Sequence, residues 1–239
     1  MGLDVYVGTL TRYYTGDWQT IVQQMGAQAG IPVQVVRPNP PRRGWLSRLL
    51  NLVLPKATPA QAVSRWQGQL QQELGLPALE WNEDPQAPYF TDKPAWDCYG
   101  ALVLWAAYEE LPNAPRRETA EGWETDSAYL TAHINPKSRY AHLVADTEIW
   151  LPAEFPAPIR TKSITGQQVV LGSSPRLQRE LTALNARTWA ADEAQLSEWR
   201  RDGAARGTPL ETSARLAFSI FSELASRSVE HRLPMKLDY

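Results

Sequence analysis

Residues 208–239 read TPLETSARLAFSIFSELASRSVEHRLPMKLDY, the longest regular pattern in the chain. Apolar side chains recur there at intervals of three and four residues, which predicts an amphipathic helix with one buried stripe. The stripe consists of Leu210, Ala214, Ala217, Phe221 and Leu224. Thr208-Pro209-Leu210-Glu211 predicts a capping box with proline at the first helical position. The tail beyond the helix keeps Leu233, Met235 and Leu237, so we expect it to pack on the body of the protein.

Further upstream, other segments carry helix signals. Thr58-Pro59-Ala60-Gln61 repeats the capping box, and Val63, Trp66, Leu70 and Leu74 follow at helical spacing up to Gly75. An apolar run predicts a helix over 95–111, ending before a proline. We expect three more helices, at 18–29 with Asp17 as N-cap, from 175 onward with Ser174 as N-cap, and over 192–201.

Strand signals alternate with these helices. Residues 4–9 predict a strand with Val5 and Val7 on one face and Tyr6 on the other. Further strands are expected at 31–36, 140–151 and 167–171, and loops at 77–91 and 112–125. The chain therefore predicts an α+β fold in a single domain, 1–239, in which a mixed sheet of a few strands is packed by five or six helices. The C-terminal half is mainly helical. A basic, proline-rich excursion at 37–59 contains one short amphipathic segment.

Composition excludes several classes of protein. Of the 239 residues, 43% are hydrophobic and 21% charged, as in ordinary globular domains. Cys98 is the only cysteine, so an intrachain disulfide is impossible and a reducing compartment is expected. The sequence has no secretory signal pattern and no run of about 20 apolar residues. A net charge of −2 argues against nucleic-acid binding. We expect a cytoplasmic protein with no membrane span and no nucleic-acid partner.

Charge is distributed in blocks. Residues 18–72 contain no acidic residue and six basic ones, whereas 73–130 contain twelve acidic residues and three basic ones. The two blocks either pair with each other inside the fold or leave an acidic stretch, 73–126, facing a basic protein partner. If that stretch is an interface, Glu83, Asp84, Glu121 and Glu124 are its candidate binding residues.

One short motif has catalytic potential. Asp97-Cys98-Tyr99-Gly100-Ala101 lies at the predicted start of a helix, where the helix dipole favours a thiolate. The pentapeptide resembles the signature of papain-like cell-wall peptidases. That resemblance implies Cys98 as nucleophile and His142, on the predicted strand 140–151, as its base. The alternative is that Cys98 is a small apolar side chain packed in a helix.

The other polar residues form no metal or cofactor motif. His133, His142 and His231 are not spaced as helix ligands, and no C-x-x-C, Walker loop or G-x-G-x-x-G is present. We therefore expect neither a metal nor a cofactor.

A dense set of recognition-type side chains lies near the start of the chain: Arg12, Tyr13, Tyr14, Asp17 and Trp18. Aromatic residues and arginine are common interface anchors, and they are equally common where a helix packs on a sheet. Both interpretations stay open at this point.

The two ends of the chain, GLDVYVGTLTRYY and SVEHRLPMKLDY, resemble an uncharacterised group of bacterial proteins of similar length, with no known activity. The sequence best fits a non-enzymatic binding protein, such as an immunity-type protein that neutralises a partner by contact. A cysteine-dependent hydrolase or transferase that uses Cys98 and His142 is the alternative. The oligomeric state does not follow from the sequence.

Overall fold

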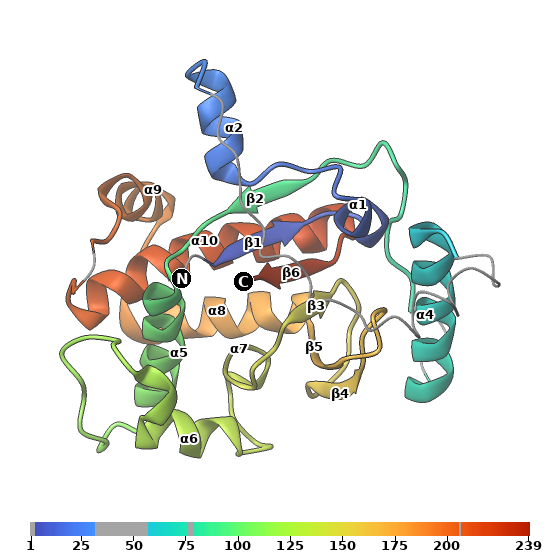
Figure 1. Ribbon diagram of the computed structural model, residues 1–239. Helices are drawn as coiled ribbons and strands as arrows, with labels where there is room; N and C mark the ends of the chain where they lie inside the picture. Colours follow the sequence, from blue (N-terminus) through green and yellow to red (C-terminus); the bar gives the residue numbers. More distant parts are fainter. Residues whose placement is uncertain (1–2, 32–56, 76–78, 206) are drawn as a thin grey trace, which may run out of the picture.

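A six-stranded mixed sheet forms the centre of the computed structural model, which describes residues 3–31, 57–75, 79–205 and 207–239 (Figure 1). The strands are β1 (Asp4–Val7), β2 (Phe90–Asp92), β3 (Ile149–Leu151), β4 (Ile159–Lys162), β5 (Gln168–Ser173) and β6 (Met235–Asp238). They lie in the order β2-β1-β6-β3-β5-β4. The β3–β5 pair is parallel, and the other described pairs are antiparallel.

The described part of the chain contains nine α-helices. They are α1 (Leu10–Thr15), α2 (Ile21–Gln28), α4 (Pro59–Leu74), α5 (Trp96–Glu110), α6 (Ser127–His133), α7 (Ala141–Val144), α8 (Ser174–Thr188), α9 (Glu193–Asp202) and α10 (Leu210–His231). The predicted α+β class, the mixed sheet and the helical C-terminal part are confirmed. The short helices α1, α6 and α7 are the ones that the apolar periodicity does not predict.

The C-terminal tail packs on the body, as predicted, in the form of strand β6 in the middle of the sheet. β6 pairs with β1 on one side and with β3 on the other. Met235 and Leu237 are fully or almost fully buried on one face. The last strand thus joins the N-terminal part of the sheet to the part formed by β3, β4 and β5.

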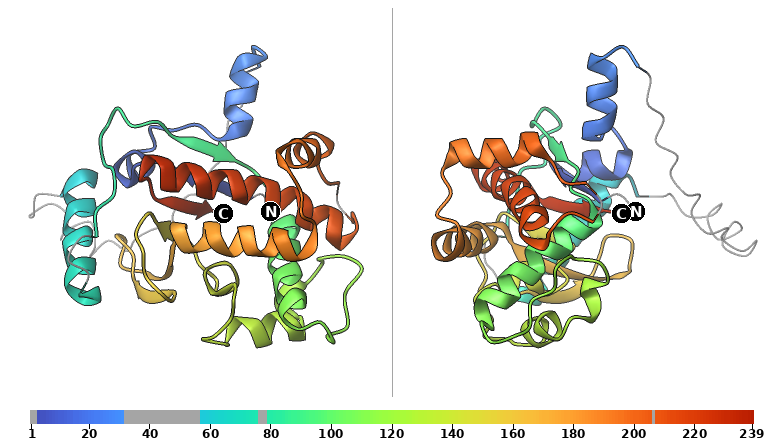
Figure 2. Two further views of the ribbon diagram at one scale, coloured as in Figure 1. Left: turned by 180° about the vertical axis from the view of Figure 1, so that it is seen from behind. Right: turned by 90° about the vertical axis from the view of Figure 1, so that its left-hand side faces the viewer.

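The sheet separates two apolar cores. Helices α8 and α10 cover one face of the sheet, and α10 packs along both α8 and α5, whose side chains belong to the same core (Figure 2). On the opposite face, Leu10 of α1 and Trp66 of α4 pack with Ile149 and Leu171. The alternation along β1 follows this division, because Val5 and Val7 belong to the first core and Tyr6 points to the other face.

The predicted strand at 140–151 is wrong over most of its length. Residues 141–144 form the short helix α7, and only Ile149–Leu151 is a strand. A brief apolar run such as His142-Leu143-Val144 fits both the helical and the strand periodicity, so contacts with the surrounding structure determine which of the two forms. Here Glu180 of α8 accepts hydrogen bonds from the backbone N–H groups of His142 (3.0 Å) and Leu143 (3.1 Å), which stabilises the helical turn.

Three predicted N-caps are also wrong. Thr20, not Asp17, caps α2, and Ser173, not Ser174, caps α8. The capping box at Thr208 does not form, because α10 begins directly after Pro209 without a side-chain cap and the Thr208 hydroxyl donates to the Ala205 carbonyl instead. The box at Thr58 is confirmed, with hydrogen bonds in both directions between Thr58 and Gln61.

Three strands lie where no strand is predicted, namely β2 at the sheet edge beside β1, β4 at the opposite edge, and β6, for which the sequence predicts only a packed tail. Each is three or four residues long, which is too short for alternation to stand out. The predicted strand 31–36 lies outside the described residues apart from Ile31. The predicted excursion 37–59 also lies outside the described residues, apart from its last three, so it stays a prediction.

Helix α5 is held by an unusually close contact at Gly100. A Cβ atom at this position would lie 2.1 Å from Cδ1 and 2.3 Å from Nε1 of Trp123, whose indole is 3% exposed. No side chain larger than hydrogen fits there unless the indole moves. The contact therefore fixes the segment around Trp123 against the first two turns of α5.

We predict opposite effects for two glycine substitutions in helices. Gly100→Ala forces the buried indole aside at a cost of about 3 kcal/mol, offset by about 1 kcal/mol of helix propensity, so the net loss is about 2 kcal/mol. Gly68→Ala, on α4, meets no atom within 4 Å and should raise stability by about 0.5–1 kcal/mol. Urea unfolding followed by circular dichroism measures both. A Gly100→Ala variant as stable as the wild type would contradict the contact.

Candidate protein-binding surface

The loop after α5 is anchored along its length. The Leu210 N–H donates to the Glu118 carbonyl (2.8 Å), which joins the loop to the start of α10. The Arg117 guanidinium donates to the Gly122 carbonyl (2.7 Å) and closes a turn within the loop. Trp123 then packs against Gly100. The loop is polar and acidic in sequence, but its backbone is fixed at three points.

The end of the loop is fixed by side chains. Asp126 caps α6 by accepting from the Ala128 N–H (2.8 Å), and it also accepts from the Tyr108 hydroxyl (2.8 Å). The Trp96 indole donates to the Glu124 carboxylate (2.8 Å). Trp96 and Trp123 also lie with ring centroids 5.7 Å apart. The carboxylate of Glu124 is therefore oriented by an aromatic residue at the start of α5.

Four exposed carboxylates gather around this loop, and we call them the acidic surface: Asp97, Glu118, Glu121 and Glu124. None of them forms an ion pair with any residue that the structure describes. Other acidic residues are neutralised. Glu109, for example, pairs with Arg139 and Arg187. The acidic surface therefore carries charge that the described part of the fold leaves uncompensated.

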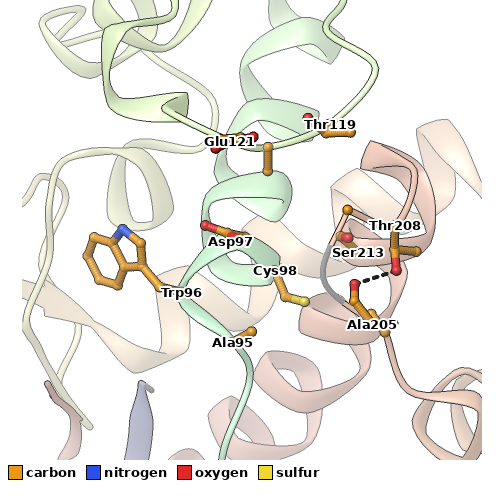
Figure 3. A pocket seen from close by; sticks show the side chains of 12 residues that line it. Ala95, Trp96, Asp97, Cys98, Thr119, Glu121, Ala205, Thr208 and Ser213 are labelled. Carbon is orange, nitrogen blue, oxygen red and sulfur yellow. Dashed lines mark hydrogen bonds between the residues drawn. The ribbon is translucent and has the colours of Figure 1, made fainter. Parts of the chain in front are cut away.

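A cavity of about 680 Å³ opens beside the acidic surface, between the start of α5, the loop and the chain that leads into α10 (Figure 3). The carboxylates of Asp97 and Glu121 line it together with the hydroxyls of Thr119, Thr208 and Ser213. All of these groups can accept hydrogen bonds. A basic side chain that entered from a partner would therefore find acceptors on several walls.

Two of the predicted acidic binding residues have structural contacts. Glu83 accepts hydrogen bonds from the Leu10 and Thr11 N–H groups (2.9 Å each) at the start of α1 and from the Trp81 indole (2.7 Å). Asp84 is exposed and accepts from the Gln86 N–H within its own turn. Glu121 and Glu124 belong to the acidic surface, where their role in binding stays a prediction.

The predicted N-terminal set joins α1 to the sheet. Arg12 donates to the carbonyls of Pro85 and Ala87 (2.6 Å each), and Tyr13 donates to Asp238 (2.5 Å). Trp18 is 6% exposed and stacks on Tyr13 at 5.6 Å. Tyr14 is half-buried, and Asp17 is exposed. The contacts fit a helix–sheet junction, one of the two interpretations left open by the sequence.

The two charge blocks do not pair in the described part of the chain. Five of the six basic residues of 18–72 lie outside it, and the sixth, Arg65 on α4, forms no ion pair with a described residue. The ion pairs of the acidic block go instead to Arg117, Arg139, Arg187 and Arg200, and none of them reaches the four residues of the acidic surface.

The structure describes no hydrogen bond between Cys98 and His142. The Cys98 thiol is 3% exposed, bonds with Ser213, and has its pKa raised by burial. His142 lies on α7, where its Nδ1 accepts from the Ser173 N–H (3.0 Å) and its ring contacts Phe155. A base must reach its nucleophile by a hydrogen bond, and the described contacts of these two side chains contain none between them.

Two buried titratable residues, His142 of α7 and Glu180 of α8, are joined through the His142 backbone N–H and not through its ring. Burial lowers the pKa of His142 to about 4, so the ring is neutral at pH 7. Burial also raises the pKa of Glu180 to about 8, although the two N–H donors of α7 favour its charged form. The two hydrogen bonds to Glu180 support the packing of α7, and neither residue lines the cavity beside the acidic surface.

Neither a metal site nor a membrane span is found in the part of the chain that the structure describes. No group of three histidine, cysteine or acidic side chains there is close enough to hold an ion. No helix over these ranges is long and apolar enough to cross a bilayer.

Comparison with known proteins gives a match to a protein family. A family model with the description "Putative DNA-mimic protein" matches residues 52–236, well over half of the chain. No curated protein and no solved structure matches. The matched range contains all four residues of the acidic surface. The match is consistent with an uncharacterised family, and it lends no support to the resemblance of residues 97–101 to papain-like peptidases.

The buried His142 should make the stability of the protein depend on pH. The pKa of His142 is about 4 in the folded state and about 6.5 in the unfolded state. Its contribution to the free energy of unfolding is therefore complete above pH 6.5 and is lost as the pH falls through 4. The loss amounts to about 3 kcal/mol. His142→Asn keeps an acceptor near the Ser173 N–H but does not titrate.

Denaturant unfolding of the wild type and of His142→Asn between pH 4 and pH 8 measures this difference. The two proteins share Glu180, so its opposite contribution cancels in the comparison. We expect the wild type to lose more stability than the variant below pH 6.5. If the free energy of unfolding changes with pH in the same way for both proteins, His142 is not the titrating group.

Proposed function

This chain belongs to the family described as putative DNA-mimic proteins, and from that membership we propose that it is a non-enzymatic protein whose acidic surface binds the DNA-binding site of another protein. The observation that carries the proposal is the set of four exposed carboxylates on the anchored loop and the adjacent first turn of α5, none of which forms an ion pair with a described residue. Such a surface offers a partner the same sign of charge, and the same kind of acceptor, as a phosphate backbone.

The chemistry of the partner follows from what binds DNA. DNA-binding proteins neutralise phosphates with lysine and arginine, and these contacts supply most of the sequence-independent affinity. Carboxylates accept the same charge-assisted hydrogen bonds, including the two parallel ones from a guanidinium. The carboxylates of Asp97, Glu118, Glu121 and Glu124 would therefore occupy positions where the partner otherwise holds phosphates.

Anchoring of the loop supports the proposal. A mobile acidic tail would lose conformational entropy on binding, whereas a fixed set of carboxylates loses little. Hydrogen bonds hold the loop at Glu118, Gly122 and Asp126, and the Trp96 indole orients Glu124. The acidic surface is thus organised before any partner arrives, as the phosphates of a duplex are.

The small net charge of the chain is compatible with this role. Long-range attraction depends on the local distribution of charge, and an uncompensated patch can steer a basic partner even when the whole chain is near neutral. The immunity-type function suggested by the sequence is one form of the proposal, with a toxin that acts on DNA as the partner. The place of action would be the cytoplasm, where DNA-binding proteins work.

The test is competitive capture. Proteins of the source cells that bind duplex DNA–cellulose are eluted and passed over the immobilised protein, with and without free duplex DNA. We expect at least one of them to be retained and to be displaced by the duplex. Asp97→Asn/Glu118→Gln/Glu121→Gln/Glu124→Gln should retain at least about tenfold less of it, since each lost charge-assisted hydrogen bond weakens binding.

A matched variant controls for net charge. Glu80, Glu193, Glu198 and Asp202 are exposed and form no ion pair with a described residue, so Glu80→Gln/Glu193→Gln/Glu198→Gln/Asp202→Asn removes the same charge elsewhere. It should retain the partner as the wild type does. The proposal fails if no protein is displaced by duplex DNA, or if the control variant loses the partner and the acidic-surface variant keeps it.

A further inference from the structure

Lys236 has an unusual position for a lysine. It lies on β6 in the middle of the sheet, opposite Tyr6 of β1 and Ile149 of β3. Its neighbours Met235 and Leu237 point into the first core, so Lys236 points to the other face, together with Ile149 and Val169. A lysine at such a position is rare because burying an ammonium group costs free energy unless it is paired.

Lys236 has no direct carboxylate partner among the described residues, although Asp238 and Glu148 attract its charge at longer range. Nζ donates to the Leu237 carbonyl (2.8 Å) and lies 4.9 Å from the centre of the Tyr13 ring. No carboxylate of the described residues forms an ion pair with it, and the nearby Asp238 accepts the Tyr13 hydroxyl instead. Burial lowers the pKa of Lys236. An ammonium group has three donors, so further acceptors are needed.

A cavity of about 190 Å³ lies next to Lys236. Its walls come from α1, from the outer face of β3 and β6, and from the hairpin between β4 and β5. The polar residues that line it are Tyr13, Tyr14, Glu148, Ser163, Thr165, Gln167, Gln168 and Lys236. In the described contacts, no hydrogen bond uses the Tyr14 hydroxyl or the side-chain amides of Gln167 and Gln168. The cavity therefore offers polar groups that the described fold does not use.

Glu148 adds an acidic group to the cavity that Lys236 lines. It interacts electrostatically with Lys236, yet the two side chains form no ion pair. Burial raises the pKa of the Glu148 carboxyl. An ammonium and a carboxylate thus line one small cavity without neutralising each other directly. A ligand with one negative and one positive end would compensate both, whereas a simple anion would be repelled by Glu148.

We propose that this cavity binds a small zwitterion of the amino-acid type, with its carboxylate at Lys236 and its ammonium group at Glu148. The volume corresponds to about six water molecules at roughly 30 Å³ each, which suits one small amino acid. The Tyr14 hydroxyl and the amides of Gln167 and Gln168 can bond a carboxylate or a polar side chain. The site is separate from the acidic surface, so it does not depend on the proposed function.

Nuclear magnetic resonance titration tests the site. Each standard amino acid is added at millimolar concentration to the full chain, and the backbone amide signals are followed. We expect at least one small amino acid to shift the amides of 163–168 in a saturable manner. Acetate and methylamine, which each carry only one of the two charged groups, should bind at least about tenfold more weakly. Titrations without a saturable shift at the hairpin would overturn the proposal, as would equal binding of acetate.

Substitutions of Lys236 and Glu148 test where the ligand binds. Lys236→Met and Glu148→Gln should each weaken binding at least about tenfold. Lys162→Met, which removes an exposed lysine of β4, should leave binding unchanged. If Lys236→Met does not fold, Glu148→Gln decides alone, because it exchanges an oxygen for a nitrogen at constant size. Binding that survives both substitutions would overturn the proposal.

Discussion

The contact between Trp123 and Gly100 is the constraint on which the arrangement of the acidic surface depends. Ten of the fifteen residues of α5 are buried, because the helix packs among α10, α6, α7 and α8, and its path is therefore fixed. The absence of a side chain at Gly100 lets the Trp123 indole reach the helix backbone. That indole fixes the loop against the same helix whose first turn presents Asp97. Packing inside the protein thus sets where charge appears on its surface.

This coupling distinguishes the acidic surface from other acidic residues of the chain. Glu83 and Glu180 accept hydrogen bonds from backbone N–H groups and stabilise helices, and Glu109 is neutralised by arginine. The carboxylates of the acidic surface form no ion pair with a described residue, although keeping like charges together costs free energy. Charge of this kind is common at binding sites, where a partner compensates it.

Much of the fold could be predicted from the sequence, and the failures have physical reasons. Helices α4, α5, α8 and α10 follow from apolar spacing, because each buries one stripe or is buried on most sides. The predicted strand at 140–151 was wrong because Glu180, far away in sequence, stabilises a helical turn there.

The acidic block indicated Glu121 and Glu124, yet not that Glu83 would be used inside the fold, since only the structure brings Glu83 to the start of α1. Asp97 was missed because the sequence indicated it only as the first residue of the peptidase-like motif, and Glu118 was missed because it belongs to no motif. Lys236 was missed because only the sheet register shows that it lies on the same face as Ile149.

Amide hydrogen exchange of the complex tests the central claim most directly. The free protein is compared with the protein bound to the partner that DNA–cellulose capture identifies. The account predicts slower exchange on this chain at 96–98 and 118–126, and on the partner in its DNA-binding elements. Slower exchange on another face, such as α2 or α9, with 118–126 unchanged, would contradict the claim that this anchored loop takes the place of DNA.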